Sequence, residues 1–225
     1  LEGAWICGQL DLSFATAAGT TSLIACGFEQ RVEALQTRFE LVDLSGSTLP
    51  GLMAEGLVAA SHLVMGDGFI AEGEVSLSGA QIGGQLACIG GRFRGAGSFA
   101  LNAQSALVAG GVFLNGSFRA EGEVSLSGAR IGGQLECIGG RFCNAGGIAL
   151  NAQNALVAGG TFLRSGFSAE GAVSLSGTQI GGQLACDGGS FHNSGSEALN
   201  AQRLRVTEGF IWRAVTVADG AVNLA

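Results

Sequence analysis

Apolar residues recur along this chain in short pairs, with one residue between the two members and the next pair arriving five or six positions later. In residues 32–59 the step is a strict five, as in Val42/Leu44 and Leu52/Ala54. Residues two apart on an extended segment point to the same side. The pattern therefore predicts short strands separated by tight turns, and each strand returns its apolar side to a common interior.

A longer repeat of 49 residues encloses this pattern and sets the predicted domain organisation. Each unit holds eight apolar pairs, so four faces per coil would give two coils per unit and about nine coils in all, spanning roughly 44 Å at about 4.8 Å per coil. We expect a single solenoid over 1–225, made of divergent coils in 1–70, tandem repeats at 71–119, 120–168 and 169–217, and a further truncated repeat beginning at 218–225. Because the pattern enters and leaves in mid-unit, we expect a longer repeat protein or end-to-end stacking of copies.

Three triplets of the pattern, Ala80-Gln81-Ile82, Val42-Asp43-Leu44 and Thr37-Arg38-Phe39, resemble the pentapeptide-repeat proteins. That resemblance implies an all-β, right-handed, four-sided parallel β-helix, although the six-residue steps and longer gaps depart from the family pattern. The motif GAxIGGQLxC at 79–88, 128–137 and 177–186 is also similar to large bacterial repeat proteins that are often labelled membrane-associated oxidoreductases. Neither resemblance carries over a catalytic residue.

Glycine and the longer gaps indicate where the coils turn. The chain has 40 Gly and one Pro, and doublets such as Gly83-Gly84 fall between apolar pairs, where corners have no room for Cβ. The gap Arg94–Ala100, with copies near 144–149 and 193–198, predicts a loop at one corner of every second coil. Phe28, Val32, Leu35 and Phe39 also fit one face of a helix, but the five-residue frame continues through them and favours the solenoid.

The cysteines predict core positions rather than a metal site or disulfides. Cys88, Cys137 and Cys186 recur every 49 residues, which places them about 10 Å apart in the predicted stack. A disulfide needs sulfurs about 2 Å apart, and zinc needs four ligands within about 2.3 Å. We interpret these three as small buried hydrophobes, and Cys7 and Cys143 as candidate exposed thiols.

The sequence shows no convincing motif for a dinucleotide site, a hydrolase or a calcium site. The IGGQL segments recur as corners and do not open a helix after a strand, as a dinucleotide site requires. His62 and His192 have no repeat counterpart and no evident nucleophile partner. The acidic motif at Glu72 and Glu74 recurs in later copies, but a solvated corner explains it better than a calcium site. We therefore predict no catalytic, cofactor-binding or metal-ligating residue, no cofactor, and no enzyme.

The net charge of −7 makes mimicry of DNA the second hypothesis. Duplex DNA carries about 26 charges over roughly 44 Å, several times what this chain offers. Arg92, Arg94, Arg130 and Arg141 also dilute the carboxylates, so a DNA-mimicking inhibitor of a DNA-handling enzyme stays an alternative. Direct binding of nucleic acid is not expected of an acidic chain with 11 basic residues.

The leading hypothesis is a non-catalytic structural or protein-interaction scaffold, with an oxidoreductase third. Leu107, Phe113, Leu156 and Phe162 lie between the members of inward pairs, so they are predicted to point outward as an apolar contact stripe. A protein partner, another copy of the chain (end to end or side by side) or a membrane surface could dock there; the recurring loop covering the stripe is an equally weighted alternative. The sequence contains no secretion signal or membrane-spanning run, which leaves the location open with a slight preference for the cytoplasm.

Overall fold

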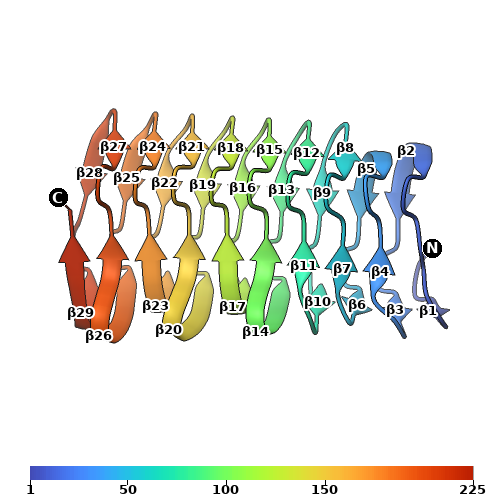
Figure 1. The fold of residues 1–225 in the computed structure, drawn as a ribbon, viewed down its shortest axis with the longest axis horizontal. Coiled ribbons are helices and arrows are strands. Elements are labelled where there is room, and N and C mark those ends of the chain that lie inside the picture. The colour runs from blue at the N-terminus through green and yellow to red at the C-terminus, as the bar shows by residue number, and fades with distance from the viewer. Residues whose placement is uncertain (225) are drawn as a thin grey trace.

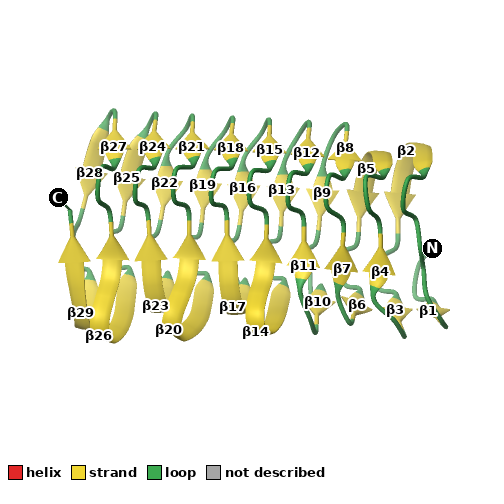
Figure 2. Ribbon diagram, viewed as in Figure 1, coloured by secondary structure: helices red, strands yellow, loops and turns green. Residues whose placement is uncertain are grey.

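The computed structural model describes residues 1–224, with side chains described throughout except at residues 96, 97, 218 and 219. Its strands pair in parallel and stack coil upon coil into a rod with the two termini at opposite ends (Figure 1). No helix occurs within residues 1–224 (Figure 2). The predicted parallel β-solenoid of about nine coils is confirmed. Residue 225, which ends the truncated repeat expected at 218–225, lies outside the described residues.

Every complete coil has four faces, which we number 1 to 4 in chain order. Faces 1 and 2 form one sheet, and faces 3 and 4 form the other. Face 1 begins with β1 (Trp5–Ile6), β3 (Gly27–Phe28), β6 (Thr48–Leu49) and β10 (Ile70–Ala71), and face 2 with β4 (Val32–Glu33), β7 (Leu52–Met53) and β11 (Val75–Ser76). From residue 92 onward one long strand per coil crosses from face 1 to face 2: β14 (Arg92–Asn102), β17 (Arg119–Ser125), β20 (Arg141–Asn151), β23 (Ser168–Ser174), β26 (Ser190–Asn200) and β29 (Thr216–Asn223).

The other two faces consist mainly of two-residue strands. β2 (Thr16–Ser22) and β5 (Arg38–Asp43) each run through faces 3 and 4. Face 3 continues with β8 (Val58–Ala59), β12 (Gln81–Ile82), β15 (Leu107–Val108), β18 (Arg130–Ile131), β21 (Leu156–Val157), β24 (Gln179–Ile180) and β27 (Arg205–Val206). Face 4 continues with β9 (Leu63–Val64), β13 (Leu86–Ala87), β16 (Val112–Phe113), β19 (Leu135–Glu136), β22 (Thr161–Phe162), β25 (Gln183–Ala185) and β28 (Gly209–Ile211).

The strand register shows how two coils fill one repeat unit. On face 2, Val75 pairs with Leu101 and Leu101 pairs with Val124, which is the counterpart of Val75 in the next repeat. The first of these two coils is the longer. One coil of the divergent part is shorter than either, because Val32 already pairs with Leu52. The inward members of the pairs are fully buried, as Leu77 and Leu86 illustrate. The apolar pairs therefore line a continuous core, as their spacing predicts.

The segment that also fitted a helical face follows the solenoid frame. Phe28 ends β3, Val32 begins β4 and Phe39 lies in β5, and all three side chains are buried in the core. The side chain of Leu35, which a helix would have buried beside them, is only half-buried in a turn. Buried pairs that recur every five or six residues, as in Val32/Ala34 and Thr37/Phe39, therefore show that this stretch follows the solenoid pattern and not a helical one.

Alternate coils place their aromatic ring at two different positions of the corner that leads into face 1, either directly before the strand or at its second residue. Phe118 and Ala120 occupy this corner in one coil, and Gly140 and Phe142 take the corresponding positions in the next. The exchange lets each ring fill the space left by the small residue in the neighbouring coil. The rings stack with centroids 5.2 to 5.4 Å apart through Phe69, Phe93, Phe118, Phe142, Phe167 and Phe191. The corner thus needs two kinds of coil, which explains why the repeat unit spans two coils rather than one.

The predicted loop is a bulged part of the long strands. The register between β14 and β17 shifts between Arg94 and Phe99, and again before Leu101. In the next copies the loop is fixed from within, since the Nδ2 atoms of Asn144 and Asn193 donate to the backbone carbonyls of Ile148 and Glu197, at 2.9 and 2.7 Å. These bulges widen the rod at the corner between faces 1 and 2 (Figure 1).

Candidate binding groove

From Gly83 to Gly182 the corner between faces 3 and 4 consists of glycine and alanine, apart from the glutamines Gln85 and Gln134 that directly precede face 4. A Cβ added to Gly83 or Gly132 would lie 2.1 or 2.2 Å from the carbonyl oxygen of Ala60 or Ala109 in the preceding coil. Because such contacts are impossible, these positions require glycine. The exposed corner is therefore a strip of bare backbone and methyl groups that runs along the rod.

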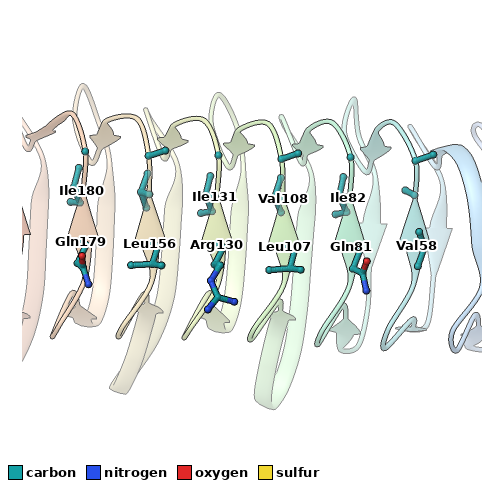
Figure 3. Close-up of a pocket in the computed structure, with 18 of the residues that line it drawn as sticks. Val58, Gln81, Ile82, Leu107, Val108, Arg130, Ile131, Leu156, Gln179 and Ile180 are labelled. Atoms are coloured by element: carbon teal, nitrogen blue, oxygen red, sulfur yellow. The ribbon is translucent and has the colours of Figure 1, made fainter.

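The first corner residue of each coil, such as Ala109 or Gly132, and the face 3 pair before it form the floor of an open groove of about 790 Å³. The groove follows face 3 across successive coils, and one outward side chain per coil stands beside it (Figure 3). In chain order this outward row is Val58, Gln81, Leu107, Arg130, Leu156 and Gln179, after which Arg205 follows. Leucine thus alternates with a longer polar or charged side chain in the middle of the groove.

The four residues predicted as an apolar stripe divide between two faces. Leu107 and Leu156 lie in the outward row of the groove and are 40 and 37 % exposed. Phe113 and Phe162 point outward on face 4 but are half-buried. Their rings lie against Gly111 and Gly160, the residues directly before the face 4 strands. The two leucines are therefore the exposed part of the stripe.

The bulged loop does not cover these leucines. The long strands β14, β20 and β26 bulge at the corner between faces 1 and 2, whereas β15 and β21 lie on the other side of the rod (Figure 1). The alternative in which the loop folds over the stripe is wrong for the described residues. Leu107 and Leu156 stay open to solvent in the isolated chain.

The charge of the groove differs from that of the whole chain. Arg130 and Arg205 line it, and no carboxylate does among the lining residues that the structure describes. Elsewhere the acidic residues are partly neutralised, since Arg94 contacts Glu72 at 2.6 Å and Glu121 at 3.7 Å. The groove is thus locally basic on a chain of net charge −7.

The repeat cysteines are core residues, as predicted. Cys88, Cys137 and Cys186 are fully buried, and burial raises the pKa of each thiol, that of Cys186 to about 12. Cys7 is exposed, whereas Cys143 is half-buried in β20, where burial and then Glu170 raise the pKa of its thiol. Within the described residues no group of three or more His, Cys, Asp or Glu side chains could hold a metal ion.

The two histidines have partners that the sequence did not reveal. The Nδ1 atom of His62 accepts a hydrogen bond from the backbone N–H of Gln85 in the next coil, at 2.9 Å. On face 1, Nε2 of His192 contacts Oγ of Ser190, two residues away on β26. No carboxylate lies within ion-pair distance of His192 in the described part of the chain, so the pair lacks the acid of a hydrolytic triad.

Sequence reasoning also missed the groove itself. Its signal was present in the small residues that recur at one corner, as Ala109, Gly132 and Ala158 do in three successive coils. Arg130 was read only as diluting the acidic charge, although the strand register places it between the two exposed leucines.

Comparisons of the chain with protein-family models, with curated proteins and with solved structures gave no significant match. A search of residues 1–224 for a helix of sufficient length and apolarity to span a membrane found none. The geometry defines the class of protein, a parallel β-solenoid with an open, partly apolar groove, and the residues of the groove are the basis for assigning a role.

Proposed function

We propose that this chain is a non-catalytic scaffold that binds a protein partner, or other copies of itself, along its side. The observation that carries the proposal is the pair Leu107 and Leu156, which are both exposed in a groove that follows the rod. Exposed apolar side chains gathered in a depression usually mark a contact surface. The rigid parallel stacking of coils holds both leucines at a fixed distance, which suits repeated recognition.

Assembly into longer rods or filaments is part of this proposal. The repeats at 71–119 and 120–168 present Leu107 and Leu156 at matching positions, so a contact made by one of these repeats can also be made by the other. Repeated contacts raise the overall affinity even when each contact is weak. Self-association would therefore depend steeply on protein concentration.

Mimicry of DNA has less support from the surface. A mimic needs a dense row of carboxylates, but Arg94 lies between Glu72 and Glu121, and Arg119 contacts Glu121 at 3.4 Å. Arg92, Arg119 and Arg141 also occupy successive outward positions on face 1. These cations interrupt the acidic surface at the corner where the carboxylates are most frequent.

A relationship to pentapeptide-repeat proteins also belongs to the proposal. The coil from Val32 to Leu52 equals four steps of five, and the buried pair Thr37/Phe39 has the small and large inward residues of that pattern. The longer coils that follow, such as those from Val75 to Leu101 and on to Val124, would then be elaborations of this simpler coil. For the oxidoreductase hypothesis, we assign no catalytic residue.

Sedimentation velocity and negative-stain electron microscopy over a hundredfold range of concentration test the scaffold proposal. We expect rods that associate side by side or end to end, and fewer such assemblies for the double variant Leu107→Gln/Leu156→Gln. Monodisperse short rods at every concentration, together with no cross-linked protein partner at the groove, would contradict it. Inhibition of a DNA-handling enzyme by these monomeric rods would instead support mimicry.

A further inference from the structure

We propose, building on the scaffold function, that the groove binds an extended peptide in the polyproline II conformation, with an apolar side chain at every third position and carboxylates between. The argument rests on three features of the groove: the spacing of its leucines, the hydrogen bonding of its floor, and its charge.

The spacing of the leucines fits a three-residue period. Leu107 and Leu156 are separated by two coils, with Arg130 in between, which corresponds to about 9.6 Å. A polyproline II helix advances about 9.3 Å per turn of three residues and returns the same side of the peptide each time. Two residues of a β-strand advance only about 6.8 Å, and two turns of an α-helix about 10.8 Å. Of the three conformations, polyproline II has the period that is closest to the distance between the two leucines.

The hydrogen bonding of the floor favours the same conformation. The backbone of the lining residues is already paired along the rod: the N–H groups of Ala109, Gly132 and Ala158 each donate to a carbonyl oxygen of the preceding coil at 2.8 Å. An added β-strand would find no free main-chain partners there, and its own N–H and C=O groups would lose water without compensation. A polyproline II peptide has no internal hydrogen bonds and keeps its backbone solvated, so it requires none.

The bare corner also allows a peptide backbone to approach closely. Ala109 and Ala158 present only methyl groups, and Gly132 between them presents none. Apolar side chains of the peptide can then enter the spaces on either side of Leu107 and Leu156, above the polar neighbours in the row. This arrangement buries the two leucines that are otherwise exposed.

Charge selects an acidic peptide. Arg130 and Arg205 are exposed, and neither forms an ion pair with any side chain that the structure describes. They lie three coils apart, about 14 Å, so carboxylates that repeat every three residues, about 9.3 Å apart, meet one arginine at a time. A second copy of the chain placed symmetrically on this groove would bring Arg130 near Arg130, so charge favours a separate acidic partner.

Fluorescence anisotropy with a labelled peptide of three Leu-Pro-Glu units tests the proposal, since nine residues span about 28 Å. We expect saturable binding that weakens with salt. The matched peptides are three Leu-Pro-Lys units, which reverse the charge, and three Leu-Gly-Glu units, which keep the register without the polyproline II preference. Both should bind at least about tenfold more weakly, because the first is repelled and the second must be ordered on binding.

Variants of the protein supply the second half of the test. Leu107→Gln/Leu156→Gln should weaken binding about tenfold or more. Arg130→Gln, which installs the residue of the repeat positions Gln81 and Gln179, should weaken it roughly threefold and flatten the salt dependence. Arg119→Ser is the control on face 1, where Ser168 is the repeat counterpart, and should leave binding unchanged. Circular dichroism checks that each variant keeps its β-structure.

Three results would overturn the proposal: no saturable binding at millimolar Leu-Pro-Glu peptide, equal binding of the Leu-Gly-Glu peptide, or full binding by the double leucine variant. If the peptide fails but the same leucine changes dissociate oligomers, the occupant is a second copy, and the scaffold function stands without this partner. If peptide binding, assembly and a cross-linked protein partner at the groove are all absent, both proposals fail.

Discussion

The phenyl ring of Phe142 lies against the α-carbon of Gly140, two residues before it on the same corner. A Cβ at residue 140 would stand 3.0 Å from Cε2 of Phe142 and 2.6 Å from the carbonyl oxygen of Leu114 in the preceding coil. The backbone of Gly140 does not have a positive φ, so any residue could adopt its conformation. Glycine is needed here for space, because the aromatic ring and the neighbouring coil occupy the place of a side chain.

Gly140→Ala should therefore destabilise the fold by about 1–3 kcal/mol through overpacking. Urea unfolding followed by circular dichroism measures the change. Gly209→Ala is the matched control, since Gly209 has an ordinary φ and no atom within 4 Å of an added Cβ. It should change the stability by less than about 0.5 kcal/mol. Equal urea midpoints for the two variants would show that the corner has room to spare.

The alternation of aromatic positions can be tested by moving one ring. Phe142→Ala should cost about 3–5 kcal/mol by leaving a cavity in the aromatic stack. Adding Gly140→Phe to it recreates the Phe118/Ala120 pattern, but in a coil whose neighbours already hold their rings, Phe118 and Phe167, at that position. The double variant should not recover stability, because aromatic rings disfavour direct face-to-face stacking. Recovery to the wild-type urea midpoint would disprove the need for two kinds of coil.

The inward pairs were predictable because a two-residue period needs no knowledge of distant contacts. Leu77, Ile82 and Leu86 are buried as their spacing indicated, and the two coils per unit followed from counting pairs. The groove was not predictable in the same way. It exists because Ala109 and Gly132 lie side by side in successive coils. The sequence alone does not show that they are neighbours, because this depends on the lengths of the alternating longer and shorter coils.

The packing of individual side chains could not be predicted from the sequence pattern either. Alternation alone makes Phe113 an outward residue like Leu107, yet its ring lies over Gly111 and becomes half-buried, while Leu107 stays 40 % exposed. The contact between Ser190 and His192 likewise depends on rotamers of residues that share one face of β26. Period-2 spacing predicts which side of a strand a residue takes, but not how its side chain then packs.

Thr161 has a buried hydroxyl group that destabilises the core, and replacing this hydroxyl with a methyl group should stabilise the fold. Its side chain is 1 % exposed on the inward side of face 4, next to Leu135 and Leu184, and its Oγ1 has no hydrogen-bond partner in the described part of the chain. The preceding repeat has Val112 at this position. Thr161→Val should stabilise the fold by about 1–2 kcal/mol, since a buried hydroxyl without a partner loses its hydration uncompensated.

Thr178 provides the opposite case for comparison. It is equally buried, but its Oγ1 donates to the carbonyl oxygen of Ala152 at 2.7 Å. Thr178→Val should destabilise by about 1 kcal/mol, because the carbonyl loses its donor. Thermal or urea unfolding of both variants checks the contrast in sign. A loss of stability in Thr161→Val would mean that its hydroxyl has a partner after all.

The buried thiols should make the fold sensitive to alkali. Burial, and then the charge of Asp187, raise the pKa of the Cys186 thiol from 9.0 to about 12. The unfolded chain therefore releases this proton near pH 9 while the folded chain retains it, so this thiol's contribution to stability is constant below pH 9 and falls as the pH rises from there toward 12. Burial acts in the same direction on the thiols of Cys88 and Cys137. Urea midpoints at pH 7, 9 and 10.5 should show this decline, and Cys186→Ala, although less stable at pH 7, should decline less steeply. Parallel declines in the two proteins would mean that another group governs the alkaline transition.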